Sequence, residues 1–143
     1  MGQFRTVTED FAVSPQISVA DVHAAAAAGY RAIIVNRPDG EEPGMTPHAE
    51  IRAAAENAGL TFTEVPIVGP PTQAAVSAMG AALSQAKGLV LAYCRSGTRS
   101  VTLWALAQAS QGEPADALVA AAGRAGYDLA GLAPALSALS AQR

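Results

Sequence analysis

The sequence predicts an α/β fold, a three-layer α/β/α arrangement around a mostly parallel central sheet of about four to five strands. Two observations lead to this fold class. Short apolar runs alternate along the chain with longer alanine-rich segments of helical length, which is the pattern of repeated strand–helix units. The 143 residues are also enough for one domain with a buried core and few for two. We therefore expect a single domain over residues 1–143.

Each expected strand is a short apolar run bounded by turn-forming residues. In chain order, the expected strands cover residues 11–18 (a short strand or turn), 30–36, 60–68 and 89–94. The segment RPDGEEPGMTP after the second of these strands is rich in glycine, proline and aspartate, so we expect a loop there. The strand 89–94 precedes the most polar short segment of the chain.

Each expected helix is an alanine-rich segment that ends near a glycine or the chain terminus. In chain order, the expected helices lie in residues 19–29, 47–59, 69–88, 100–110, 114–126 and 132–143, the third beginning near the prolines of its segment and ending before Gly88. Ser18 and Thr46 precede the first two helices and are expected to cap them, because a hydroxyl oxygen accepts an unpaired N–H of the first turn. Gly29 and Gly59 are expected to end the same two helices.

The composition excludes several classes of protein. The formal net charge of −3 gives no basic surface for nucleic acid, and no apolar run is long enough to cross a membrane. The single cysteine cannot form an internal disulfide, and the N-terminal segment lacks the pattern of a signal peptide, so we expect a cytoplasmic protein. The two histidines, His23 and His48, are isolated in the sequence, so we expect no metal and no cofactor.

The segment AYCRSGTRS, residues 92–100, joins an expected strand to an expected helix. We call this segment the cysteine loop. In that position several backbone N–H groups and the positive end of the helix point into one concavity, and Arg95 and Arg99 add two full charges. These positive groups favour the thiolate form of Cys94. Gly97 lets the backbone turn. The hydroxyl groups that could donate to a thiolate or a bound anion are those of Ser96, Thr98 and Ser100.

A second polar loop, residues 37–44, follows the strand 30–36. Loops that follow parallel strands lie at the same edge of a sheet, where α/β proteins bind ligands. We therefore expect Arg37 and Asp39 to border the cysteine loop, with Arg37 orienting an anionic ligand. On turn chemistry alone, an exposed turn remains an equal alternative for both residues.

The spacing of cysteine and arginine resembles two families. Protein tyrosine and dual-specificity phosphatases carry a cysteine, five intervening residues and an arginine, whereas single-domain rhodaneses carry a shorter C-R-x-G-x-R loop. In this chain four residues separate Cys94 from Arg99, which is similar to the rhodanese loop. A shorter loop should form a tighter ring, better suited to a sulfur atom on Cys94 than to a phosphate in front of it.

The general acid offers a second comparison. Phosphatases of this kind use an aspartate upstream of the cysteine to protonate the leaving oxygen. The segment VGPPTQ, where it would belong, has no acidic residue, and between Glu50 and Cys94 the only acids are Glu56 and Glu64, in an expected helix and strand. Asp39 could substitute from the neighbouring loop, although nothing in the sequence requires it.

Four runs along the chain are ISVADVHAAAAAGYRAIIVNRPDGEEPG, PIVGPPT, VLAYCRSGTRSVTLWALA and AAAGRAGYDLAGL. Through these runs, most of the chain, from about Phe11 to Leu132, resembles the bacterial beta-lactamase hydrolase-like or phosphatase-like family. The resemblance implies a protein tyrosine phosphatase-like fold of the dual-specificity type. Some members are fused to a metallo-β-lactamase-fold persulfide dioxygenase and act as sulfurtransferases, so the resemblance also implies a persulfide dioxygenase-type partner.

These observations together predict a sulfurtransferase. Cys94 would take sulfane sulfur from thiosulfate or a persulfide, hold it as a persulfide, and pass it to a thiol or cyanide. The N–H groups of residues 95–100 would stabilise the anion, Arg95 and Arg99 would neutralise charge, and Ser100 would tune the thiolate. Two alternatives stay open: a phosphatase with a phosphocysteine on Cys94 that acts on a phosphoester, and a non-catalytic module that binds anions or senses redox state. A homo-oligomer also stays open, because alanine-lined helices bury little area.

Overall fold

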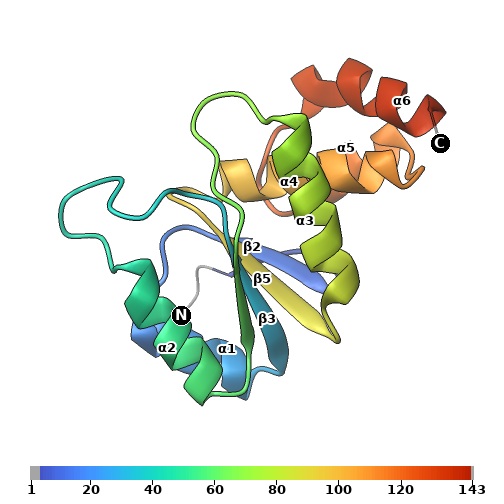
Figure 1. The fold of residues 1–143 in the computed structure, drawn as a ribbon. Helices are drawn as coiled ribbons and strands as arrows, with labels where there is room; N and C mark the ends of the chain where they lie inside the picture. Colours follow the sequence, from blue (N-terminus) through green and yellow to red (C-terminus); the bar gives the residue numbers. More distant parts are fainter. Residues whose placement is uncertain (1–3, 143) are drawn as a thin grey trace.

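The computed structural model describes residues 4–142 as a five-stranded sheet with helices on both faces (Figure 1). The ends of the expected domain, residues 1–3 and 143, lie outside the described residues. In sequence order, the strands are β1 (Arg5–Thr8), β2 (Phe11–Ser14), β3 (Tyr30–Val35), β4 (Thr61–Glu64) and β5 (Leu89–Tyr93). Their spatial order is β1-β2-β5-β3-β4. The β2–β5, β5–β3 and β3–β4 pairs are parallel, and β1 pairs antiparallel to β2 at the edge.

The helices form the two outer layers. They are α1 (Val19–Ala27), α2 (His48–Asn57), α3 (Gln73–Gln85), α4 (Thr98–Ser110), α5 (Ala115–Arg124) and α6 (Ala133–Ala141), with a short 3-10 turn at Ala130–Leu132. Figure 1 shows α1 and α2 together on one face of the sheet and the other four helices on the opposite side. The alternation of side chains along β3 agrees with this layering, because Ile33 and Val35 pack with residues of α1 and α2 while Ile34 packs with residues of α3 and α4.

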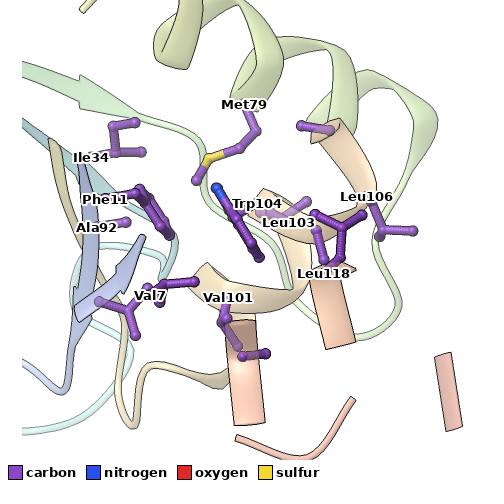
Figure 2. Close-up of a cluster of buried hydrophobic side chains, with 14 of the residues drawn as sticks. Val7, Phe11, Ile34, Met79, Ala92, Val101, Leu103, Trp104, Leu106 and Leu118 are labelled. Atoms are coloured by element: carbon purple, nitrogen blue, oxygen red, sulfur yellow. The ribbon is translucent and has the colours of Figure 1, made fainter. Parts of the chain in front are cut away.

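The larger core lies between the sheet and α3, α4 and α5. Trp104 of α4 stacks on Phe11 of β2, with ring centroids 5.4 Å apart and an angle of 8° between the planes. Met79 reaches toward this pair from α3 and is fully buried (Figure 2). This packing fixes the position of α4 on the sheet, and the N-terminal end of α4 carries the cysteine loop.

The structure confirms the predicted fold class, and it corrects three local predictions. An additional antiparallel strand, β1, precedes the first expected one, and β4 ends at Glu64 rather than at residue 68. Ser18 caps α1 as predicted, but Thr46 does not cap α2: Pro47 occupies the cap position, without a side-chain hydrogen bond. Within residues 4–142, no helix is both long and apolar enough to cross a membrane.

Candidate active site

The cysteine loop lies at the centre of one edge of the sheet. It leaves β5, which lies between β2 and β3, so the carboxyl ends of all three strands meet there. The backbone N–H of Cys94 donates to the carbonyl of Ser14 at the end of β2, with 3.4 Å between nitrogen and oxygen, and the N–H of Asn36 donates to the carbonyl of Tyr93 at 2.8 Å. The base of the loop is thus hydrogen-bonded to neighbouring segments on both sides.

Cys94 lies on the floor of this loop. Its side chain is buried, and its Sγ accepts a hydrogen bond from the backbone N–H of Gly97 at 3.1 Å. Gly97 is the N-cap of α4 and has a φ of 98°, in the left-handed region that favours glycine. Cys94 Sγ therefore lies at the N-terminus of α4, in contact with the backbone N–H of its N-cap residue.

Tyr127, which follows α5, packs against the cysteine loop at Ser96 and Gly97. Its hydroxyl donates to the carbonyl of Ser96 at 2.9 Å. A Cβ atom at Gly97 would lie 2.1 Å from the Tyr127 hydroxyl oxygen, so only glycine fits between the loop and this ring. Burial is the main cause that raises the pKa of Tyr127 above its usual value, which keeps the hydroxyl protonated as a donor.

Arg99, in the first turn of α4, is paired with a carboxylate that the sequence analysis did not single out. Its two terminal nitrogens donate to the two oxygens of Glu41, at 2.9 and 2.7 Å, and Nη1 also donates to the carbonyl of Ile67 at 2.9 Å. The hydrogen bonds to Glu41 are the main cause that raises the pKa of Arg99, and the neighbouring Cys94 adds to it. The Arg99 guanidinium therefore interacts with both Glu41 and Cys94.

Arg37 is fully buried and does not line an open surface. Its three nitrogens donate to Glu41 Oε1, Gln16 Oε1 and Glu42 Oε1, each at 2.9 Å. The hydrogen bond from Arg99 is the main cause that lowers the pKa of Glu41 to about 2, and the hydrogen bond from Arg37 adds to it. Arg37 thus holds the β3–α2 loop beside the cysteine loop, and the two loops share one network of charges.

The other predicted site residues divide into three groups. Arg95 is largely exposed and lies 3.7 Å from Glu42. Ser96 and Thr98 are also exposed and bond to each other, with 3.1 Å between their hydroxyl oxygens. Ser100 is fully buried, and its hydroxyl has no hydrogen-bond partner among residues 4–142.

Asp39 is engaged at the start of α2. Its carboxylate accepts the backbone N–H of His48 at 3.1 Å, at the start of α2. The role considered for it as an acid beside Cys94 has no contact to support it. Glu64 is likewise engaged elsewhere: its carboxylate bonds His48 and Arg52, each at 3.0 Å, and the bond to His48 is the main cause that lowers its pKa.

Sequence reasoning did not single out Glu41, Gln16 and Tyr127, which the structure brings to the loop. For Glu41 and Tyr127, the signal in the sequence was their place in segments shared with the family, NRPDGEEPG and AAAGRAGYDLAGL. Gln16 lies outside the quoted segments. A cavity of about 580 Å³ lies elsewhere, near the first residues of β3 and β5, and its lining includes no predicted site residue.

Comparison with known proteins places this geometry in a family. The model of the family "Beta-lactamase hydrolase-like protein, phosphatase-like domain" matches residues 3–111. The chain belongs to this family. A beta-lactamase hydrolase-like protein of Xylella fastidiosa is 39% identical over 125 residues, and one of Agrobacterium fabrum is 36% identical over 107 residues. These matches cover 86% and 74% of the chain but only 29% and 25% of the two relatives, so the chain spans less than a third of their length.

Solved structures support the same placement. A crystal structure of a candidate phosphatase from Neisseria meningitidis is similar with a TM-score of 0.81 and 34% identity, over 94% of this chain and 96% of that one. Tk-PTP and PTPMT1 in complex with PI(5)P each superpose with a TM-score of 0.73 at 16% and 17% identity, over 99% and 98% of this chain and 99% and 96% of theirs. At that identity the likeness shows the fold alone, which is the phosphatase-like fold that the sequence predicted.

Proposed function

We propose that this chain is a cysteine-dependent enzyme that removes the phosphoryl group from a phosphomonoester through a phosphocysteine on Cys94. The observation that carries the proposal is the position of Cys94 Sγ, which accepts the Gly97 N–H at the N-terminus of α4, next to the Arg99 guanidinium. The phosphatase-like fold and family support it. This proposal favours the phosphatase alternative of the sequence analysis over its first prediction.

The reaction would run in two steps. The Cys94 thiolate attacks phosphorus, an S–P bond forms, and the P–O bond to the leaving group breaks. Water then attacks phosphorus and the S–P bond breaks, so that inorganic phosphate leaves with the protons of the water and the thiolate is restored. Backbone N–H groups of the loop and Arg99 stabilise the equatorial oxygens in both steps. Because residues 65–72 carry no acid, we expect the leaving oxygen to take its proton from solvent, which favours phenolic leaving groups over alkyl ones.

Sulfur transfer remains the second candidate, because two observations favour it. Only four residues separate Cys94 from Arg99, and no acidic residue lies in the 65–72 segment. Thiosulfate chemistry needs no acid: the thiolate attacks the outer sulfur, an S–S bond forms, the S–S bond of thiosulfate breaks, and sulfite leaves. An acceptor thiolate or cyanide then attacks the outer sulfur and restores the Cys94 thiolate. For this reaction, a persulfide dioxygenase-type protein is the proposed partner. Both reactions need a reduced thiol, so we propose a cytoplasmic location.

One set of assays decides between the candidates. The purified protein is tested for hydrolysis of an aryl phosphate and for sulfur transfer from thiosulfate to cyanide. We expect aryl phosphate hydrolysis, lowered at least about a hundredfold in Cys94→Ser. Mass spectrometry of the acid-quenched reaction would show an addition of about 80 Da on Cys94 for a phosphoryl group and about 32 Da for a sulfur atom.

The outcomes separate the three candidate functions. Sulfur transfer that depends on Cys94, without phosphate hydrolysis, would replace the proposal by the second candidate. Silence in both assays from a folded protein that still binds sulfate would leave the non-catalytic anion-binding module. Hydrolysis that survives in Cys94→Ser would overturn every role proposed for the thiol.

A further inference from the structure

The Arg99 guanidinium already holds an anion that belongs to the chain. Glu41 accepts from both terminal nitrogens of Arg99, at 2.9 and 2.7 Å, in the two-bond geometry that arginine uses for carboxylates and phosphates. Nη1 has two hydrogens, and its bonds to Glu41 and to the Ile67 carbonyl use both of them. Three of the five N–H groups of Arg99 are therefore used, and its Nη1–Nη2 side, which could clamp an incoming anion, is occupied by Glu41.

We infer that Glu41 is a built-in competitor for the anion site, and that an anionic substrate that binds the Nη1–Nη2 side of Arg99 must displace the Glu41 carboxylate. The inference rests on the proposed function only in that the displacing anion is the substrate. It also names a substrate class, because an ion that displaces a carboxylate from between two guanidiniums must interact with them more strongly. A dianionic tetrahedral group does so and a monoanionic carboxylate does not. Glu41 thereby selects for dianions.

The surroundings of Glu41 allow this exchange. Its side chain is 27% exposed, whereas that of Arg37 is fully buried. The segment that carries it lies between Gly40 and Gly44, which have φ values of 69° and 82°, and a Cβ atom added at either glycine would meet no other atom within 4 Å. When Glu41 leaves, Arg37 keeps its bonds to Gln16 and Glu42, so the base of the loop stays in place.

A role for Glu41 as the missing general acid does not fit the same contacts. Two arginines donate to its carboxylate, and its pKa of about 2 keeps it ionised at neutral pH. A carboxylate without a proton cannot protonate a leaving group. Its charge instead makes it a competitor of the substrate for the same donors.

The test is a calorimetric titration with sulfate, which needs no turnover. We expect Glu41→Gln to bind sulfate about tenfold more tightly than the unmodified protein, because the free site no longer has to be vacated first. The matched control is Glu42→Gln, which removes the same charge from the same loop but leaves the pair with Arg99 intact; we expect a change of less than about twofold. Arg99→Lys should lose most of the sulfate affinity, which assigns the binding to this site.

Sulfate affinity that is unchanged or weaker in Glu41→Gln would overturn the inference, as would an equal gain in Glu42→Gln. A fall in turnover of Glu41→Gln at unchanged sulfate affinity would overturn it too, and would make Glu41 a catalytic residue. Because the titration is independent of chemistry, tighter sulfate binding in an otherwise inactive protein supports the inference while the proposed function fails. Unchanged or weaker sulfate binding by Glu41→Gln, in a protein that hydrolyses aryl phosphate, overturns the inference and leaves the proposed function in place.

Discussion

At the scale of single residues, Gly97 connects the backbone of the cysteine loop to its chemistry. Its left-handed conformation turns its N–H toward Cys94 Sγ, and its missing side chain leaves room for the Tyr127 hydroxyl. The same position therefore sets the hydrogen bond to the sulfur and the close approach of the ring. Either requirement alone favours glycine there.

Gly97→Ala should destabilise the protein and disturb the site. A Cβ atom would lie 2.1 Å from the Tyr127 hydroxyl oxygen, and alanine is strained at a φ of 98°, so we expect a loss of about 2–3 kcal/mol in the free energy of unfolding. Urea unfolding measures the loss, and the rate of Cys94 alkylation by iodoacetamide should change with the loop. The matched control is Gly123→Ala, an exposed position in α5 with no atom within 4 Å, where alanine should be neutral or stabilising. Equal effects at the two glycines would contradict the role assigned to Gly97.

The sequence indicated some residues of the site and not others, for a physical reason. Cys94, Gly97 and Arg99 lie within one short segment at a strand–helix junction, so their proximity follows from local geometry. Glu41 is 58 residues from Arg99 along the chain, and Tyr127 is 31 residues from Ser96. Their contacts depend on how α2 and α5 pack on the sheet, which no local pattern specifies.

At the scale of elements, the β3–α2 loop is organised by contacts that replace an ordinary cap. The sequence pointed to Thr46 as the cap of α2, yet the N–H of His48 is satisfied by Asp39 from the other end of the loop. Arg37 holds the middle of the same loop through Glu41 and Glu42. The loop that carries Glu41 is therefore tied both to the sheet and to the helix that follows it.

Asp39→Ala should destabilise α2 by about 1 kcal/mol, because it leaves a helix N-terminal N–H without its partner. Thr46→Ala should cost less than about 0.5 kcal/mol. Urea unfolding of both variants measures the difference. If Asp39 acts only in this way, its variant keeps the turnover rate and the pH profile of the unmodified enzyme. A larger loss of unfolding free energy in Thr46→Ala than in Asp39→Ala would show that Thr46 caps α2, as the sequence suggested. If the turnover rate of Asp39→Ala no longer fell at basic pH, Asp39 would be the general acid.

The strands that differ from expectation also have physical causes. In β1 only Val7 is buried among the four residues, so there was no apolar run to detect, and its pairing is with the next strand across a tight turn. The chain after β4 stays bonded to the neighbouring segment through the N–H groups of Val65 and Ile67. Both side chains are buried, so the apolar pattern continues beyond the last residue of the regular strand.

At the scale of the whole molecule, side chains of opposite charge lie together at the sheet edge that carries Cys94. The buried Arg37, in the loop after β3, and the partly exposed Arg99, in the first turn of α4, both pair with Glu41. This cluster joins segments that are distant in the chain, so it stabilises the tertiary structure as well as shaping the site. Its contribution depends on the ionisation of Glu41.

The free energy of unfolding should therefore fall at acidic pH, as Glu41 becomes protonated. The pKa of Glu41 falls from 4.5 to about 2 on folding, mainly through the hydrogen bonds from Arg99, so its contribution is complete above about pH 4.5 and is lost as the pH falls toward 2. At pH 7 we expect Glu41→Gln to be less stable by about 1 kcal/mol, since the ion pairs are partly screened by solvent. The difference should shrink below pH 4.5 and vanish near pH 2. Thermal unfolding of both proteins across this range measures it.

The lowered pKa of Glu64, set first by His48, acts in the same direction, but it is present in both proteins and cancels in the difference. Glu9→Gln serves as the control, because Glu9 lies in the exposed turn between β1 and β2 and makes no ion pair within residues 4–142. Its variant should follow the unmodified protein at every pH. A difference for Glu41→Gln that persists undiminished to pH 2 would mean that the carboxylate stabilises the fold by packing or by neutral hydrogen bonds, and not through its charge between the two arginines.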